Sequence, residues 1–423
     1  MKFFNLFILC FFFFLFSNCK PAVKQLENTS ELNTTLENVL QKIFEEEELI
    51  GMSVLAIADK QLIYEGYFGL SNKQNQTPVN RSTAYRIASI SKTVTAAAAM
   101  LLVEKGAINL DTDVNNYLNF SVINPYFPDT PITLRMLLNH TSSIVDGESY
   151  SQFSTKMFQE KLNIKELFNN ENSEYGNNLF LKKKPGSYFT YSNVAWGIVG
   201  TLVEQISGKN FQTYCQENLF IPLEMQASFD PALLKASTNL ATLYRFNSAW
   251  VPQKDNEVSN ALLIPIQEDY EPGRNALLYA PQGGLRVSAH SLANFLQMLM
   301  NSGIFKEKQI LKKETVDLMC SPQWTYKEGN GDTSHNLFHS WGLGIHRLTN
   351  QPNADVAIRN LKMLGHPGEA YGLISDMYFS PQKKKGFIFI TNGKKGDFKS
   401  TKESAFYETE EKVFKALNQY LYK

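Results

Sequence analysis

Three short motifs along the chain carry residue types that can perform nucleophilic catalysis. In chain order they are Ser89-Ile-Ser-Lys92, Tyr191-Ser-Asn193 and His366-Pro-Gly368. A serine hydroxyl is hardly ionised at neutral pH, so it becomes a nucleophile only beside a group that takes its proton. A desolvated lysine can lose its charge near neutral pH and accept that proton. The first motif therefore offers a nucleophile and a base, and the other two offer polar groups to complete a site.

The residues around Ser89 predict that it lies at the first turn of a buried helix. A run of helix formers follows it, and Gly106 is a typical helix stop. Apolar residues occupy both helix faces, and such a helix belongs in a core. Ser89 and Lys92 are three residues apart and so share a face. The alternative is a helix-capping serine beside a solvated lysine, and the apolar surroundings argue against it.

Tyr191 and Asn193 are predicted to lie on a tight loop. A turn begins at Pro185, and an apolar helix is expected over 194–206, closed by Gly208. In that place the phenol of Tyr191 can project into a cleft and relay a proton, and the amide of Asn193 can bind substrate or hold Lys92. The alternative is a structural turn in which the aromatic ring only fills space.

His366 is predicted at the edge of a strand or in the turn that enters it. The segments 370–379 and 386–391 read as strands joined by a hairpin. The alternative is a satisfied structural histidine. Glycines on both sides of the His-Pro pair let a ligand approach the backbone closely.

In these motifs, their order and their separations, the chain resembles the serine β-lactamase and penicillin-binding hydrolases. The resemblance is to the class C-like branch, which includes D-amino-acid peptidases, D-Ala-D-Ala carboxypeptidases and esterases, and it covers roughly residues 35 to 420. Further matching segments are Leu137-Leu-Asn-His-Thr-Ser-Ser143, Asn109-Leu-Asp-Thr-Asp-Val114, Gly283-Gly-Leu-Arg-Val-Ser288 and Trp341-Gly-Leu-Gly344.

The resemblance implies a role for each matching residue. Ser89 would be the acylated nucleophile, and Lys92 would activate it or shuttle its proton. Tyr191 would be the general base in acylation and would help to protonate the leaving group. Asn193 would orient the substrate, and His366 stands where relatives carry lysine or histidine.

The resemblance also places the oxyanion hole. It would consist of the backbone N–H of Ser89 and that of Glu369, the residue after Gly368, and losing one such donor costs about 100- to 1,000-fold in turnover. Many relatives have threonine where this chain has Pro367, which has neither a hydroxyl nor an N–H. Because that threonine helps to bind the substrate carboxylate in β-lactamases, efficient β-lactam hydrolysis is not expected. Ser143 replaces a glycine common in relatives, and this affects a loop without a catalytic role.

Composition excludes several other functions. Lys plus Arg equals Asp plus Glu at 41 each, so nothing indicates nucleic-acid binding. No phosphate-binding loop or dinucleotide fingerprint occurs, and no cofactor is expected. His335 and His339 have a spacing that could bind a metal on a helix, but they follow a loop-like segment, so no metal site is predicted.

The first residues predict export. Lys2 precedes a 14-residue apolar stretch from Phe3 to Phe16, which is the length of a signal peptide and too short to span a bilayer. Cys19 follows, which favours a lipoprotein-type signal over 1–19, a lipidated Cys19 and a polar tether over 20–30. Ordinary signal cleavage is the alternative. The protein is then expected in the cell envelope, anchored to a membrane through lipid.

Two cysteines remain after that segment, Cys215 and Cys320. They lie far apart in the sequence and outside the motifs. Free buried thiols are favoured over a disulfide.

The fold predicted for 31–423 is α+β. N- and C-terminal helices, over about 31–48 and 402–421, would flank an antiparallel sheet, and strands are expected at 52–58 and 62–69. The α/β lobe would comprise about 31–110 and 330–423, with a mostly helical lobe over about 110–330. The site would lie between the lobes.

The predicted function is a serine hydrolase that forms an acyl-enzyme on Ser89. Its substrates would be small amides or esters, including D-amino-acid peptides of the cell wall. The alternative is a catalytically silent relative that only binds peptide or cell-wall fragments, which Pro367 favours and the intact motifs oppose. The sequence leaves the substrate and the oligomeric state open.

Overall fold

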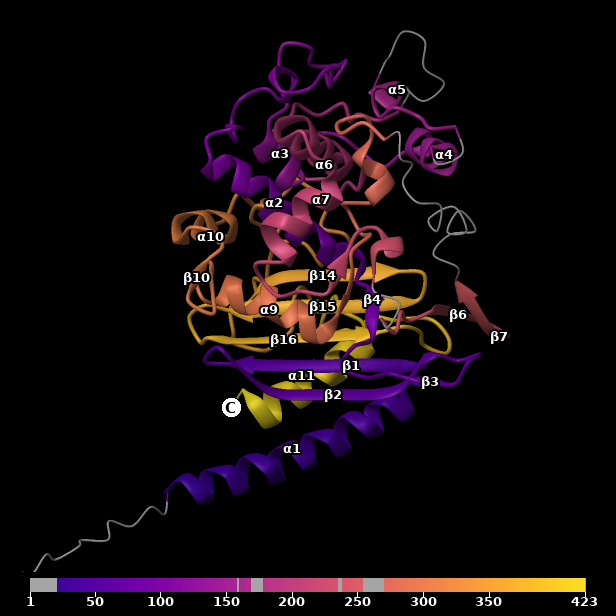
Figure 1. Ribbon diagram of the computed structural model, residues 1–423, viewed down its shortest axis with the longest axis vertical. Helices are drawn as coiled ribbons and strands as arrows, with labels where there is room; N and C mark the ends of the chain where they lie inside the picture. The colour runs from indigo at the N-terminus through magenta and orange to yellow at the C-terminus, as the bar shows by residue number, and fades with distance from the viewer. Residues whose placement is uncertain (1–20, 158–159, 169–177, 235–237, 254–269, 423) are drawn as a thin grey trace, which may run out of the picture.

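The computed structural model describes residues 21–157, 160–168, 178–234, 238–253 and 270–422. A nine-stranded sheet with the order β11-β12-β13-β14-β15-β16-β1-β2-β3 forms its centre (Figure 1). Its strands are β1 (Gly51–Ala58), β2 (Gln61–Asn72), β3 (Thr77–Pro78), β11 (Trp324–Thr325), β12 (Ser340–Trp341), β13 (His346–Arg347), β14 (Leu364–Ala370), β15 (Leu373–Ser380) and β16 (Lys385–Thr391). All of its paired strands are antiparallel, so the first and last parts of the chain meet where β1 pairs with β16.

Helices cover this sheet and build a second lobe beside it. They are α1 (Pro21–Glu46), α2 (Ser91–Glu104), α3 (Leu134–Leu138), α4 (Glu148–Lys156), α5 (Lys165–Phe168), α6 (Val194–Ser207), α7 (Phe211–Cys215), α9 (Ala289–Met300), α10 (Lys313–Cys320) and α11 (Glu408–Leu421). Short strands accompany them, namely β4 (Ala84–Arg86), β5 (Ala227–Ser228), β6 (Leu243–Asn247), β7 (Ala249–Gln253), β8 (Arg286–Ser288), β9 (Ile304–Phe305) and β10 (Lys308–Gln309). Figure 1 shows α2, α3, α6 and α7 gathered in the upper lobe, above β14.

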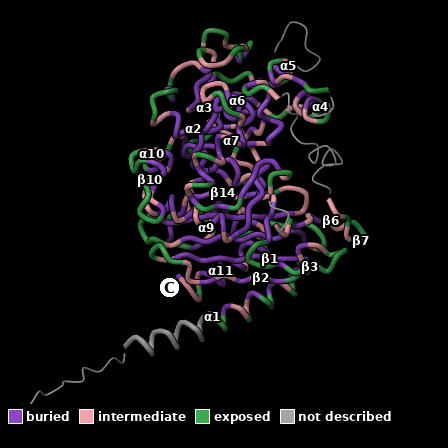
Figure 2. The backbone as a smooth tube through the Cα atoms, viewed as in Figure 1, coloured by how far each residue is buried: buried purple, intermediate pink, exposed green. Residues whose placement is uncertain are grey.

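The central strands are buried on both faces because their side chains alternate between two cores. On β1, Val54 and Ala56 point into the core shared with α1 and α11. Leu55 and Ile57 point into the core that contains α9, α2 and α6. Figure 2 shows the resulting buried interior, which runs through the sheet and into the upper lobe. The predicted α+β fold with its antiparallel sheet is confirmed.

Local predictions from periodicity agree closely with these elements. The β1–β2 hairpin turns at Asp59 and Lys60, whose φ angles are 46° and 70°, as a tight two-residue hairpin turn requires. Helix α2 is buried from Ser91 to Leu102, and Gly106 after its end has φ of 69°. The buried helix predicted after Ser89 is therefore confirmed.

Some boundaries differ from the prediction. Helix α1 begins at Pro21, so residues 21–30, expected as a tether, are helical. Proline is favoured at the first position of a helix, and the residues that follow are helix formers without a glycine. Helix α11 begins at Glu408. Two helices also pack against the lobe in which they were not expected. Helix α9, expected in the helical lobe, packs on β1, β15 and β16 of the sheet, and α2, expected in the α/β lobe, packs on α6.

The predicted signal peptide, including Cys19, lies outside the described residues. Of the helices described, none has the length and apolar character to cross a membrane. Cys215 and Cys320 are free, as predicted.

Candidate active site

Ser89 lies on the short 3-10 turn η1 (Ala88–Ile90) that leads directly into α2. Ala88 has φ of 48°, a conformation that a residue with a side chain rarely adopts. Ser91 holds this turn, because its Oγ donates to the Ala88 carbonyl (2.7 Å) and accepts from the Leu285 N–H (3.1 Å). The strained turn presents a half-buried Ser89 between two buried neighbours.

Lys92 is completely buried one turn further along α2. Its Nζ lies 3.1 Å from Ser89 Oγ and donates to Asn193 Oδ1 (2.7 Å) and to the Gln282 carbonyl (2.8 Å). Burial lowers the pKa of Lys92 to about 7, although the charge of Asp146 acts in the opposite direction. The amine is thus poised to exchange a proton near neutral pH.

The two carbonyl acceptors decide where the lone pair of a neutral Lys92 points. A neutral amine has two hydrogens and one lone pair. When the hydrogens are donated to Asn193 and Gln282, the lone pair is left for the third contact, the hydroxyl of Ser89. This geometry suits Lys92 to accept the Ser89 proton.

Tyr191 stands on the other side of the nucleophile, and stacked rings fix its orientation. Its ring lies between His140 (centroids 4.4 Å apart) and Phe338 (5.3 Å), and Lys92 Nζ lies 4.8 Å from its centre. Burial raises the pKa of Tyr191, while a hydrogen bond with Ser89 acts in the opposite direction. The phenol therefore keeps its proton at neutral pH, as a proton donor to a leaving group would, and the general-base role of Tyr191 stays a prediction.

His140 supports the loop that carries Tyr191. Its Nδ1 accepts from the Ser192 N–H (3.1 Å), and its carbonyl accepts from the Thr190 N–H (2.9 Å). Burial lowers the pKa of His140 well below its usual value, so the ring is a neutral stacking platform.

Asn193 connects Lys92 to a residue that the motifs did not reveal. Its Oδ1 accepts from Lys92, and its Nδ2 donates to Asp146 Oδ2 (2.7 Å). Gln282, which contributes only its backbone carbonyl, was also missed. Neither residue carries a signal in the sequence, because one acts across a loop and the other through its main chain.

Gly368 brings strand β14 against the turn of the nucleophile. A Cβ atom there would lie 2.4 Å from Ser375 Oγ, 2.7 Å from the Ile87 carbonyl and 3.2 Å from the Ser89 nitrogen. Only glycine allows this approach. The close approach at Gly368 thus brings β14 against the turn that carries Ser89, and the oxyanion hole of the Ser89 and Glu369 N–H groups stays a prediction.

His366 lies inside β14, not at its edge, and is completely buried. Its Nδ1 is 2.6 Å from the Pro367 carbonyl, and its Nε2 has no hydrogen-bond partner among the described residues. Burial lowers the pKa of His366 well below its usual value. Its ring is 6.2 Å from that of Tyr191, and it is not among the residues that line the cavity. The structure places it behind Tyr191, and its catalytic role stays a prediction.

A cavity of about 520 Å³ opens in front of Ser89. Tyr191, Asn193, Leu337 and Phe338 line one part of it. The wall made by β14 and the start of α11 contributes Pro367, Gly368, Glu369, Tyr407 and Glu410. Tyr407 OH donates to Glu369 Oε2 (2.8 Å), and Glu410 accepts from the Tyr407 N–H (2.6 Å). We call Glu369 and Glu410 the acidic wall.

His335 and His339 lie in a loop and not on one helix, so the spacing that could hold a metal has no helical basis. His335 is instead exposed at the rim of the cavity.

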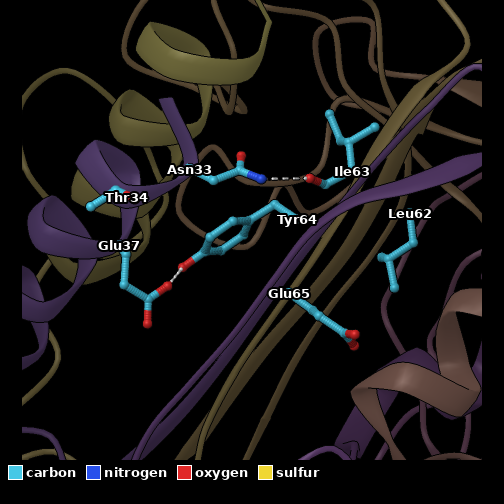
Figure 3. Close-up of a pocket in the computed structure, with 7 residues that line it drawn as sticks. All are labelled: Asn33, Thr34, Glu37, Leu62, Ile63, Tyr64 and Glu65. Carbon is cyan, nitrogen blue, oxygen red and sulfur yellow. Dashed lines mark hydrogen bonds between the residues drawn. The ribbon is translucent and has the colours of Figure 1, made fainter. Parts of the chain in front are cut away.

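A second cavity, of about 470 Å³, lies where α1 passes over β2 (Figure 3). Its polar groups bond to one another: Asn33 Nδ2 donates to the Ile63 carbonyl (3.3 Å), and Tyr64 OH donates to Glu37. None of its described lining residues is a serine, cysteine, histidine or lysine. The cavity at Ser89 is therefore the candidate active site.

Comparison with known proteins identifies the family of the chain. The sequence profile of the family described as Beta-lactamase matches residues 36–408. A penicillin-binding protein of Bacillus subtilis (strain 168) is 28% identical over 192 residues, which are 44% of this chain and 40% of that protein. Protein flp of Staphylococcus aureus (strain MRSA252) is 24% identical over 201 residues, 47% of this chain and 38% of that one. The matches thus cover about two-fifths of the length of these curated relatives.

Solved structures match over almost the whole chain. The octameric penicillin-binding protein homologue from Pyrococcus abyssi has a TM-score of 0.68 at 23% identity and covers 92% of this chain and 77% of that one. The D-amino acid amidase from Ochrobactrum anthropi SV3 has a TM-score of 0.63 at 20% identity and covers 92% and 99%. At these identities the likeness concerns the fold.

Proposed function

Because the chain belongs to the beta-lactamase family, as its motifs predicted, we propose that it is a serine hydrolase that works through an acyl-enzyme on Ser89. The observation that carries the proposal is the contact of Ser89 Oγ with Lys92 Nζ at 3.1 Å, with both other hydrogen bonds of the amine going to carbonyl oxygens. Lys92 is completely buried, and its burial favours the neutral amine that can take a proton from Ser89.

Acylation begins with neutral Lys92. Ser89 Oγ attacks the substrate carbonyl carbon while its proton passes to Lys92 Nζ, which becomes an ammonium. The negative charge moves to the carbonyl oxygen, where the N–H groups of Ser89 and Glu369 would stabilise it. The bond to the leaving group then breaks.

The leaving amine or alkoxide needs a proton, and Tyr191 is the protonated group beside Ser89. Tyr191 donates to the leaving group and regains a proton from the Lys92 ammonium. Water then attacks the acyl-enzyme and its proton passes to Lys92 Nζ; as the bond between Ser89 Oγ and the acyl carbon breaks, the Lys92 ammonium protonates Ser89 Oγ and the acid product leaves. Each proton that leaves Ser89 or water is thus returned to a product or to the catalyst.

The negative charge of the acidic wall favours small amides or esters that carry an amine and disfavours those that carry a carboxylate. None of the described residues that line the cavity is a lysine or arginine, and Pro367 offers no hydroxyl or N–H to a carboxylate. Glu369 adds a negative charge to the same wall. The structural neighbour described as a D-amino acid amidase complexed with D-phenylalanine makes D-amino-acid amides a natural first choice.

Covalent labelling tests the nucleophile. We expect a fluorophosphonate probe to add to wild-type protein on Ser89 and not to Ser89→Ala. Ser334→Ala is the matched control, because Ser334 lines the same cavity and should leave labelling intact. Equal labelling of Ser89→Ala would reject the assignment. Binding of D-amino-acid amides without hydrolysis of any ester or amide would favour the silent relative.

We further propose that Cys19 anchors the protein to the cell envelope through lipid, a proposal that rests on the apolar stretch before it. Cys19→Ser should move the protein from the membrane to the soluble fraction. Membrane association of Cys19→Ser equal to that of wild type would contradict it.

A further inference from the structure

Asp146 is the group that organises the start of α6, although it lies 47 residues earlier in the chain. Its carboxylate accepts from the backbone N–H groups of Asn193 (2.7 Å) and Val194 (2.9 Å) and from Ser192 Oγ (3.2 Å). It also accepts from Asn193 Nδ2. The side chain of Asn193, which stands at the N-cap position, makes no capping bond itself. Asp146 therefore caps the helix from another loop.

The bond to Asn193 Nδ2 has a consequence beyond capping. A side-chain amide can turn over and exchange its oxygen and nitrogen, and its partners decide which orientation it takes. A carboxylate accepts only, so Asp146 requires the NH₂ group to face it. The oxygen must then face Lys92, as observed.

We propose that Asp146 is a positioning residue for acyl transfer, because it holds the Asn193 amide in the orientation that directs the Lys92 lone pair at Ser89. The proposal deepens and rests on the proposed function. With the amide reversed, an N–H donor would face the amine and attract the lone pair away from the hydroxyl. Asp146 thus acts on the nucleophile through two intermediate side chains and touches no reacting atom.

The charge of Asp146 adds a second effect with a definite sign. It favours the protonated form of Lys92, against the effect of burial. The other titratable groups around the amine are His140, His366 and Tyr191. Tyr150 lies beside Gln282, and its hydroxyl accepts from Gln282 Nε2 (3.2 Å). Burial keeps all four neutral near pH 7, so the charge of Asp146 is the one that a substitution there would remove.

Asp146→Asn tests both effects in the full-length protein. The new amide keeps an oxygen that can cap the helix, but it can donate to Asn193 and so favours the reversed amide. We expect the plateau of kcat/KM for an activated ester to fall about 10-fold, which corresponds to about 1.4 kcal/mol. Because a negative charge has gone, the pKa of Lys92 should fall. The limb of the pH profile, which is the range where kcat/KM rises as Lys92 loses its proton, should therefore move to lower pH. Asp146→Glu, which keeps the charge and the acceptors, should restore most of the rate.

A structural role alone would give a different pattern. Asp113→Asn is the matched control, because Asp113 caps the short 3-10 helix η2 (Val114–Asn116), with its Oδ1 accepting from the Asn115 N–H (2.9 Å), and is not among the residues that line the cavity. This variant should keep the plateau and the pH limb. In an Asn193→Ala background, Asp146→Asn should still shift the limb but should no longer lower the plateau, since the amide is gone.

The outcomes separate this proposal from the proposed function. If wild-type protein turns over and Asp146→Asn keeps both its plateau and its limb, Asp146 has no positioning role, whereas Ser89 keeps its own. An equal loss from Asp146→Asn in both backgrounds would likewise reject positioning, because the loss would not pass through Asn193. If wild-type protein neither turns over nor labels on Ser89, both proposals fall.

Discussion

Lys92 and Glu47 are two buried ionisable groups in one fold, and their surroundings act on them in opposite ways. Lys92 contacts a hydroxyl and two carbonyl oxygens. Glu47, which follows α1, accepts from Lys394, Lys412 and Thr409. Burial lowers the pKa of Lys92 to about 7. Burial alone would raise the pKa of Glu47, but hydrogen bonds from its two lysines lower it to about 2.

The difference separates a group suited to proton transfer from a group suited to holding helices together. Glu47 remains charged because cations compensate its burial, and it ties the end of α1 to Lys394 and to the start of α11. Among the described residues, no carboxylate bonds to Lys92, so burial makes its neutral form accessible. A buried ion pair holds helices together, whereas a buried amine without a charged partner in contact can exchange a proton.

Replacement of Lys92 should have the largest effect on catalysis. We expect Lys92→Met to lower kcat/KM about 1,000-fold or more, because the Ser89 proton then has no acceptor. The protein should still fold, since methionine fills the buried space of the lysine stem. Lys105→Met, at the exposed end of the same helix, should keep full activity. Retained activity in Lys92→Met, measured with an activated ester, would assign the base to another group.

The pH dependence of the reaction sharpens the comparison. Only neutral Lys92 can take the Ser89 proton, so kcat/KM should rise about tenfold per pH unit below pH 7 and level off above it. The substrate must not ionise in this range. A limb centred near pH 10 would show that the amine is an ordinary charged lysine.

The same group gives a stability effect that can be measured against Lys92→Met. In the unfolded chain Lys92 keeps its proton up to the ordinary lysine pKa of 10.5, whereas burial in the folded protein lowers that pKa to about 7. The unfolded state therefore binds more protons between these values, and wild-type stability should rise with pH across this window relative to the variant. Urea unfolding at pH 6, 8 and 10 measures this difference, and parallel curves would contradict it.

Removal of the Glu47 charge should affect stability and leave catalysis unchanged. We expect Glu47→Gln to lower the free energy of unfolding by about 3 kcal/mol, because Lys394 loses its buried carboxylate partner and Lys412 keeps only its pair with Glu408. In wild type this contribution is present above pH 4.5 and is lost as the pH falls towards 2. The neighbouring Glu48→Gln is the control: its ion pair with Lys395 is exposed, and the change should stay within about 0.5 kcal/mol.

The sequence predicts the catalytic groups that act through side-chain type and fails for those that act through position. Ser89, Lys92 and Tyr191 stand in motifs whose chemistry is visible in the residue names, and the structure brings them together. The Gln282 carbonyl and the cap supplied by Asp146 have no such signature. Both arise from loops that meet only after folding.

The fold, too, has features that the sequence predicts and features that it does not. Periodicity locates the β1–β2 hairpin and α2, because a strand or helix records its burial in its own residues. It does not assign α9 to the sheet, since an amphipathic helix shows that it has a partner without showing which one. For the same reason the sequence showed His366 near a strand but not its place behind Tyr191.

The acidic wall should give the smallest effect, because Glu369 is exposed and solvent screens it. We expect Glu369→Gln to lower the preference for a D-alanine anilide over its N-acetyl form about 3-fold, which is about 0.7 kcal/mol, within the range for exposed charge pairs. The ratio of the two kcat/KM values reports this preference and cancels any general loss of activity. Glu403→Gln, an exposed acid outside the residues that line this cavity, should leave the ratio unchanged. An unchanged ratio in Glu369→Gln would mean that this charge does not reach the substrate amine, and the selectivity would then have to come from the shape of the cavity.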